Sequence, residues 1–472
     1  MNGVNTILDS RPSGERLFAF IVAAVLSAVF VLVVILSRGN RAAILAFPLV
    51  SFLLVLQARF ELALSALVVC LFVDIHVSFF SSAVVYSFLF GIAFFLRSRD
   101  IRWSEFSNPM TVPIILYGLC VIPSFFNAVQ PLMCAYKLLN VFSFLIVMYV
   151  VVGGLRSYDN ARRMVAVYIG AAALNGVVVI WDATHQVLRP FGPAGIMFGD
   201  YAGLGVCVAL VMTALSRGRD RLIAGSLALL LCASLVLTQI RNAWIATFVT
   251  LVICGVYIVF RSGSLGLPRR EVFRTVMIGG LFILLVSAAV VGLAPRVGTR
   301  AAGLGAADFG DIDEHGLIHN SLISRAFIWD AALSAFRDHP FIGVGVYGFP
   351  DASAMYTRLP STLYNYYVAR NSPHQTHFAV LSETGIVGAI GYLLFLIAGI
   401  RSAFGAIRTS RDDRERRYAV VGMAAFMYIV VSMTFTDAWL WGQGIVLLGL
   451  SLGGLLALRK INSPSPESGV RA

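Results

Sequence analysis

Long hydrophobic runs separated by short polar segments fill most of the sequence. Runs of this length suit helices that cross the roughly 30 Å hydrocarbon core of a bilayer, and they lack the alternation of barrel strands. In lipid, only helices and closed barrels satisfy their backbone hydrogen bonds. The pattern predicts an all-α, polytopic transmembrane helical bundle with about 14 spans, or 12 to 14. The expected spans cover residues 17–37, 42–57, 62–77, 79–96, 110–126, 134–153, 164–183, 200–216, 222–239, 242–260, 275–293, 379–400, 418–436 and 440–458.

One segment departs from this pattern, because residues 294–378 form a long polar stretch between two spans. Loops of this length are uncommon and usually functional. Within it, the pattern predicts an amphipathic helix over 324–340, with Ser321 or Ser324 as its N-cap. The glycines of 341–350 predict a tight turn that closely approaches another part of the molecule.

The runs and loops divide the chain into five regions. We expect an N-terminal transmembrane region (1–109), a central transmembrane region (110–293), a large periplasmic loop (294–378), a C-terminal transmembrane region (379–460) and a disordered cytoplasmic tail (461–472).

Composition supports a membrane protein. Hydrophobic residues make up 58% of the chain and charged residues only 13%, against roughly 25% in soluble proteins. A surplus of this size does not fit inside one soluble core, so lipid must solvate part of it. The six cysteines lie in or beside hydrophobic runs without metal-ligand spacing, so neither a disulfide framework nor a zinc site is expected.

The net charge of +12 is concentrated in short loops. This is the positive-inside pattern of a multi-pass protein rather than the signature of nucleic-acid binding, so no nucleic-acid partner is expected. With the N-terminus in the cytoplasm, the dense basic clusters fall on the cytoplasmic side. These clusters are 97–102, 156–163, 217–221, 261–274 and 408–417.

Three basic side chains then share the opposite side: Arg241 at the start of a span, Arg325 in the loop helix and His374 at the end of the loop. Arginine offers a fork of donors that suits phosphate oxygens, and a neutral histidine can remove a proton from a hydroxyl. Each residue also has a purely structural interpretation. An arginine at a span end can simply extend to the membrane interface, and the other two can be ordinary loop residues.

Other polar side chains lie near the same side. Arg189, His377 and Glu383 are possible accessory residues, whereas Asp200 and Asp437 are interpreted as structural. No carboxylate pair suggests a divalent metal, so neither a metal nor another cofactor is expected.

Three segments in order resemble the motifs of the O-antigen ligase and O-antigen polymerase superfamily of bacterial integral-membrane glycosyltransferases. LTQIRNAWIA (237–246) is similar to its first arginine motif, with Arg241 on the arginine. The next two motifs match at Arg325, Trp329, His339, Pro340, Gly343 and Gly345, and then at His374, Leu381, Glu383, Gly385 and Gly388. The chain departs from the last motif at Gln375, His377 and Phe378, which flank His374.

The resemblance implies a metal-independent, inverting glycosyltransferase that builds cell-surface polysaccharide such as O-antigen, lipopolysaccharide or exopolysaccharide. Its donor would be an undecaprenyl-diphosphate-linked oligosaccharide, and its acceptor a saccharide or lipid A-core. Arg241 and Arg325 would bind the diphosphate, and His374 would activate the acceptor hydroxyl. The active site would face the periplasm from the bacterial inner membrane, in contact with membrane lipid.

Two alternatives stay open. The resemblance does not separate a ligase from a polymerase. A transporter or flippase of lipid-linked oligosaccharide would also have many spans and buried arginines, but it is expected to show internal repeats and no dominant outer loop.

Overall fold

The computed structural model describes residues 60–72, 76–77, 80–97, 108–185, 190–293, 321–437 and 443–462. The spans expected at 17–37 and 42–57, the loop residues 294–320 and the tail from 463 lie outside the described residues.

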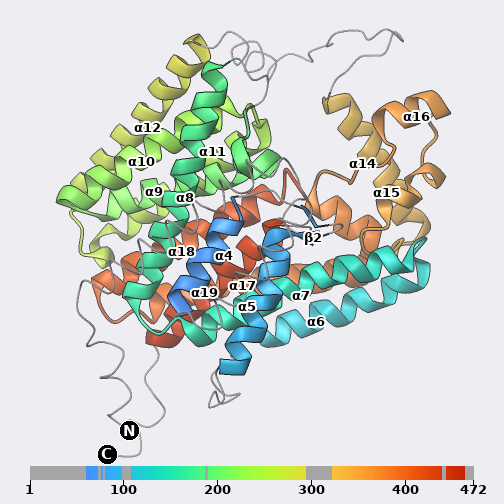
Figure 1. The fold of residues 1–472 in the computed structure, drawn as a ribbon, viewed down its shortest axis with the longest axis horizontal. Helices are drawn as coiled ribbons and strands as arrows, with labels where there is room; N and C mark the ends of the chain where they lie inside the picture. Colours follow the sequence, from blue (N-terminus) through green and yellow to red (C-terminus); the bar gives the residue numbers. More distant parts are fainter. Residues whose placement is uncertain are drawn as a thin grey trace, which may run out of the picture.

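The described chain is helical (Figure 1). The bundle contains α4 (Phe60–Cys70), α5 (Ser82–Arg97), α6 (Thr111–Val121), α7 (Pro131–Gly154), α8 (Tyr158–Thr184), α9 (Phe198–Leu215), α10 (Gly218–Leu237), α11 (Arg241–Arg261), α12 (Arg269–Leu293), α17 (Thr376–Arg408), α18 (Asp413–Ser432) and α19 (Gln443–Asn462). Shorter elements are the 3-10 helices η2 (Ile122–Asn127), η3 (Gly192–Met197), η4 (Ser262–Leu265) and η5 (Ser353–Met355), and the helices α14 (Ser321–Asp338), α15 (Phe349–Ala352) and α16 (Ser361–Tyr367).

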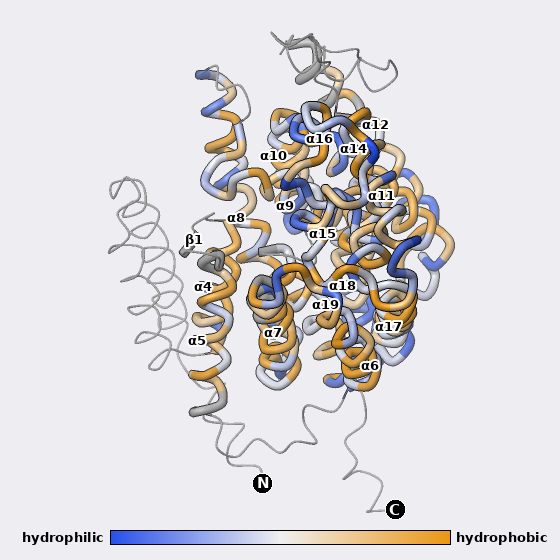
Figure 2. The backbone as a smooth tube through the Cα atoms, turned by 90° about the vertical axis from the view of Figure 1, so that its right-hand side faces the viewer, coloured by the Kyte–Doolittle hydropathy of each residue, from blue (hydrophilic) through white to orange (hydrophobic). Residues whose placement is uncertain are grey.

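The prediction of a helical membrane protein is confirmed for the described residues. Six helical stretches in the described part are long and apolar enough to cross a bilayer. They are Tyr158–Thr184, Gly192–Leu215, Gly218–Leu237, Arg241–Leu265, Thr376–Arg408 and Gly444–Ile461. Figure 2 shows the hydrophobic residues that run along α4, α5 and α7 as well. The total of about 14 spans stays a prediction.

The third expected span, 62–77, is shorter than predicted. Helix α4 ends at Cys70, and β1 (His76–Val77) then pairs antiparallel with β2 (Phe80–Ser81) before α5 begins. The hydrophobic pattern alone does not register this break, because a buried strand and a buried helix segment have similar composition.

Helix α9 is the centre of the bundle. Nearly all its residues are buried, and it packs against α8, α10, α11 and α18. Beside it, α7 and α19 run in parallel and approach closely at Gly449 and Gly453 of α19. A Cβ atom on either glycine would lie 2.9 Å from a backbone carbonyl oxygen of α7. Small residues four apart are a common means of close helix packing in membranes.

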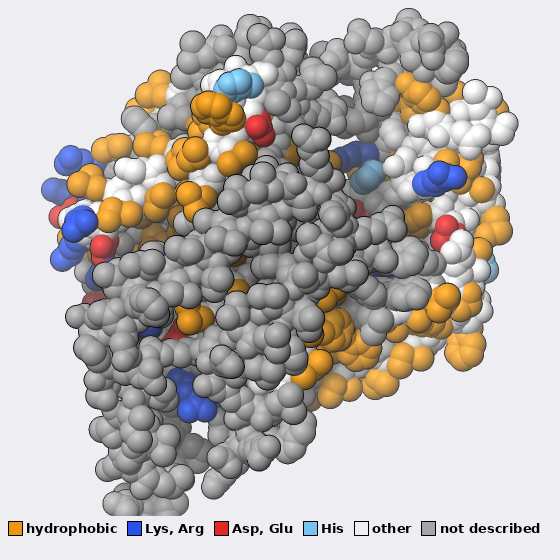
Figure 3. All heavy atoms as spheres, viewed as in Figure 1, with side chains coloured by type: hydrophobic (Ala, Val, Ile, Leu, Met, Phe, Trp, Pro, Cys, Tyr) orange, Lys and Arg blue, Asp and Glu red, His pale blue; other side chains and the backbone are white. Residues whose placement is uncertain are grey.

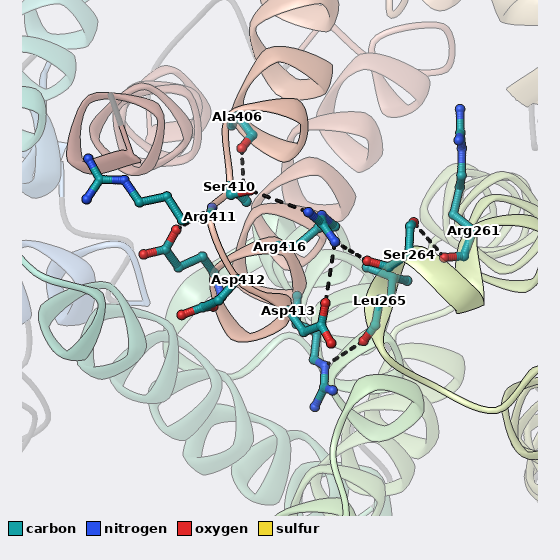
Figure 4. Close-up of polar contacts among 11 residues, drawn as sticks. Arg261, Ser264, Leu265, Ala406, Ser410, Arg411, Asp412, Asp413 and Arg416 are labelled. Carbon is teal, nitrogen blue, oxygen red and sulfur yellow. Dashed lines mark hydrogen bonds and ion pairs between the residues drawn. The ribbon is translucent and has the colours of Figure 1, made fainter. Parts of the chain in front are cut away.

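One end of the bundle, which we call the arginine face, gathers four basic segments: 156–163, 217–221, 261–274 and 408–417. Arg414 pairs with Asp159 at 3.2 Å, and Arg162 pairs with Asp220 at 3.6 Å. Figure 4 shows Arg416 reaching both Ser410 and Ser264, which joins the turn before α18 to the turn after α11. The helices on either side of these turns therefore end at the same depth along the bundle.

Helix α11 links this face to the other end of the bundle. It begins at Arg241 and ends at Arg261, a length of roughly 30 Å at 1.5 Å per residue. That length matches the hydrocarbon core of a bilayer. We call the opposite end, formed by the starts of α9, α11 and α17 and the end of α18, the site end.

The segment 321–368 forms a small lobe at the site end (Figure 1). The predicted loop helix is present as α14, and Ile328, Ala331, Ala332 and Ala335 bury one face of it in the lobe's own core. The cap predicted at Ser324 is wrong, because Ser324 lies inside the helix, whereas the alternative cap Ser321 is the first residue of α14 and stays a prediction. The Ser324 hydroxyl instead donates to the Tyr367 carbonyl at 2.7 Å.

The lobe is joined to the bundle at a break in α17. Gly385 has φ +62° and ψ −165°, a backbone conformation that interrupts the helix. In a continuous helix, Ile386 and Val387 would donate to the carbonyls of Ser382 and Glu383. Here those two N–H groups donate to Pro340 and Phe341 of the lobe, at 2.8 and 3.2 Å.

The two freed carbonyls of α17 are satisfied by the same loop. Val344 and Gly345 donate their N–H groups to the carbonyls of Ser382 and Glu383, each at 3.0 Å. The Tyr347 N–H also donates to the buried Glu383 carboxylate at 2.9 Å. We call this arrangement of 339–347 against 382–387 the joint. The close approach predicted from the glycines of 341–350 is made to α17.

We predict that Gly343→Ala and Gly385→Ala each destabilise the protein strongly. Both residues have positive φ, and a Cβ on either would lie 2.3–2.4 Å from backbone atoms across the joint. The conformational strain alone costs about 1–3 kcal/mol, and the overlap adds to it. Thermal unfolding of the detergent-purified protein measures the effect.

Gly218→Ala is the matched control, since Gly218 has φ +56° but no atom near the position of its Cβ. It should carry the cost of positive φ without the overlap. Equal losses of stability in all three variants would contradict the role assigned to the joint.

Candidate active site

Helix α14 presents Arg325 and Trp329 on one face, because residues four apart are neighbours on a helix. The Trp329 indole donates to the Pro373 carbonyl at 3.0 Å, and its ring lies 5.4 Å from that of Phe378. The Arg325 guanidinium donates to the Phe435 carbonyl at 3.5 Å. This face of α14 therefore contacts both the segment before α17 and the segment after α18.

His374 belongs to the segment before α17 and contacts the segment after α18, in a constrained backbone conformation. Its φ is +54°, which is uncommon for a residue with a side chain. The His374 N–H donates to a carboxylate oxygen of Asp437 at 3.2 Å. Two residues later, Thr376 donates its N–H to Met433 and its hydroxyl to Thr436. These bonds fix the residues around His374 to the end of α18.

Asp437 is buried, with only 6% of its surface exposed, and its charge acts on both His374 and Arg325. Burial lowers the pKa of the His374 imidazole below its usual 6.5; the nearby Asp437 charge opposes this shift, and Arg325 adds to it. Burial also lowers the pKa of Arg325, and Asp437 again opposes the shift. Arginine remains charged at neutral pH, so the site sets a fixed cation beside an imidazole whose pKa is lowered.

Arg241 lies at the same end of the bundle on a different helix. Its neighbour Ile240 packs on Gly199 near the start of α9, where a Cβ would lie 2.5 Å from the isoleucine side chain. The adjacent Asp200 accepts a hydrogen bond at 2.9 Å from Ser432, the last residue of α18. The structure thus brings Arg325 and His374 together at the segment after α18, and it sets Arg241 at the same site end on α11.

The accessory candidates have other surroundings. His377 lies inside α17, and its ring is 5.8 Å from that of Tyr392. Glu383 is buried and belongs to the joint through its bond from Tyr347. Arg189 lies outside the described residues. Gln375, which departs from the family motif, is the N-cap of α17 and accepts the Phe378 N–H at 2.8 Å.

Sequence reasoning missed Asp437 as a member of the site. The available signal was a carboxylate directly after the span expected at 418–436, on the side that also holds His374. No spacing rule connects residues 63 positions apart, so the contact itself comes from the tertiary structure.

In Figure 3, a recess beside the lobe shows basic and histidine side chains, whereas other basic and acidic side chains gather at the far edge.

Residues 225–393 match the model of a family described as O-antigen ligase. The match runs from α10 into α17 and includes Arg241, Arg325 and His374. A search of curated proteins finds none that matches the chain. This is a multi-pass helical membrane protein, and its residues 225–393 are similar to the O-antigen ligase family. The resemblance seen in the sequence motifs is thereby confirmed.

We predict opposite shifts of the His374 pKa in two variants. The wild-type imidazole should titrate below 6.5, so it is mainly neutral at pH 7. Asp437→Asn removes an anion that favours the imidazolium, so the pKa should fall further. Arg325→Gln removes a cation that disfavours the imidazolium, so the pKa should rise.

NMR titration of protein labelled at its histidines measures these shifts, and the signal lost in His374→Gln assigns the resonance. Arg337→Gln, at an exposed position of α14, is the control and should leave the midpoint unchanged. Shifts of the same sign in the Asp437 and Arg325 variants would contradict the electrostatic arrangement.

Proposed function

We propose that this protein is a glycosyltransferase that moves a glycan from undecaprenyl diphosphate to an acceptor hydroxyl in cell-surface polysaccharide synthesis. The observation that carries the proposal is that Arg325 and His374 both bind the segment after α18, Arg325 at the Phe435 carbonyl and His374 at Asp437, at the end of the bundle where Arg241 begins α11. A fixed cation beside a neutral imidazole suits a reaction in which a diphosphate leaves as a hydroxyl loses its proton.

In the proposed reaction, Arg241 and Arg325 bind the donor diphosphate through their guanidinium groups. His374 takes the proton of the acceptor hydroxyl, and the oxygen attacks the anomeric carbon from the side opposite the diphosphate. The bond from that carbon to the diphosphate oxygen breaks, with inversion at the carbon. The two guanidinium groups stabilise the charge that develops on the departing diphosphate. The step is proposed to need no metal.

Asp437 would act as a positioning residue in this scheme. Its bond to the His374 N–H holds a strained backbone conformation, and its charge lies close to both functional side chains. The arginine face would lie in the cytoplasm of a bacterial inner membrane, and the site end would face the periplasm, following the positive-inside rule. The acceptor would be a saccharide for a polymerase or lipid A-core for a ligase.

We predict that His374→Ala lowers glycan transfer by roughly 10²-fold or more, because the acceptor hydroxyl loses its general base. Purified protein incubated with labelled lipid-linked donor and each acceptor measures this loss. The acceptor that is glycosylated decides between ligase and polymerase. Donor binding should change little, and full transfer by the variant would remove His374 from its role.

We predict that Arg241→Lys and Arg325→Lys each lower transfer by about tenfold or more, since a point charge does not replace a two-pronged donor. The same transfer assay applies. Arg337→Lys is the control on the exposed side of α14 and should keep wild-type transfer. If both lysine variants were as active as the control, diphosphate binding by these arginines would be excluded.

A flippase of lipid-linked oligosaccharide is the competing hypothesis. A liposome assay of donor flipping separates the two, because the enzyme hypothesis predicts no flipping that depends on Arg241. Flipping that Arg241→Ala abolishes and His374→Ala leaves intact would favour the transporter.

A further inference from the structure

A long groove lies between α11 and α12, with the second half of α9 as its floor. Its volume is about 1160 Å³, and its lining is almost entirely apolar. Gly255 of α11 and Gly279 and Gly280 of α12 contribute no side chains to it, and Gly280 has open space where a Cβ would stand. Lipid chains are the only solvent that a hydrophobic groove on the flank of a transmembrane bundle meets.

The groove covers the half of the bundle nearest the arginine face. On α11 its lining runs from Phe248 to Phe260, a distance of roughly 18 Å at 1.5 Å per residue. Half of a hydrocarbon core of about 30 Å is about 15 Å. The groove is therefore about as long as one leaflet is thick. Its lining on α11 begins at Phe248, so it does not reach Arg241 or the site end.

Positive charge stands at one end of the groove. Arg269 and Arg270 belong to its lining, and the Arg269 guanidinium lies over the Phe260 ring, 5.9 Å from its centre. The segment 261–274 around this end contains four arginines and one glutamate, which gives a net charge of +3. These arginine side chains are exposed. An apolar channel one leaflet long with a cationic end complements a lipid with an anionic headgroup.

We propose that this groove binds an acyl chain of an anionic glycerophospholipid from the leaflet at the arginine face. Its phosphate headgroup contacts Arg269 and Arg270, and its chain packs along α11 and α12. The position favours such a lipid over the polyprenyl tail of a glycan donor, because Arg241 and Arg325, the residues proposed to bind the diphosphate, lie at the site end. The lipid site stands whether or not glycan transfer is established.

Native mass spectrometry of the full-length protein, titrated with phosphatidylglycerol or phosphatidylcholine of identical acyl chains, tests the proposal. The wild type should bind phosphatidylglycerol more tightly. Arg269→Gln/Arg270→Gln should weaken that binding roughly 25-fold, at about fivefold for each arginine near an anionic lipid. The charge-matched control, Arg217→Gln/Arg408→Gln, changes two exposed arginines outside the groove lining and should bind as the wild type does.

A second variant tests the chain site independently of charge. Gly280→Phe fills the groove and should reduce phosphatidylglycerol binding, whereas Gly170→Phe on α8, which also has open space and lies outside the groove lining, should not. Equal binding of the two phospholipids by the wild type, or unchanged binding in Gly280→Phe, overturns the proposal. Displacement of bound phosphatidylglycerol by undecaprenyl diphosphate would assign the groove to the donor tail instead.

Discussion

The exchange of backbone hydrogen bonds at the joint is the constraint on which the site end depends. Helix α17 lacks two of its own backbone hydrogen bonds at Gly385, and the loop after α14 supplies partners for the two N–H groups and two carbonyls left free. A buried N–H or carbonyl without a partner costs so much in an apolar environment that the two segments must stay together. The Asn127 amide adds a bond to the Gly343 carbonyl at 2.9 Å, which ties the turn after α6 to the same place.

The joint explains why two glycine-bearing motifs far apart in the chain occur together. Gly343 and Gly385 each face the other segment's backbone at a distance that excludes a side chain. Because α14 ends just before the joint and His374 lies just before α17, fixing the joint also fixes the direction of α14 over the end of α18. As a consequence of that direction, Arg325 reaches the Phe435 carbonyl close to the Asp437–His374 bond, and Trp329 adds a bond to the Pro373 carbonyl.

The two ends of the bundle have different electrostatic character. At the arginine face, exposed arginines pair with carboxylates, as Arg414 does with Asp159, and the half-buried Arg417 donates to the carbonyls of Leu215 and Leu265. Exposed pairs of this kind contribute little to stability, so the sign of the surface matters more than any single bond. At the site end, Asp437 is buried and Arg325 and His374 are half-buried, so these groups act more strongly on one another. A charged lipid and a diphosphate would be held at opposite ends of α11.

The sequence by itself determined the membrane class, the positions of most helices between 111 and 462, the loop helix α14 and the three motifs. These follow from local properties, namely the length of apolar runs, the spacing of polar residues and the order of Arg241, Arg325 and His374. The tertiary structure decided that Glu383 serves the joint and that Gln375 caps α17. It also decided that Asp437 joins the site and that Ser324 bonds to Tyr367 instead of capping a helix. Such contacts depend on the backbone groups that a broken helix leaves unsatisfied and on the distant segment that satisfies them. The periodicity of one segment contains no information about its contacts with another.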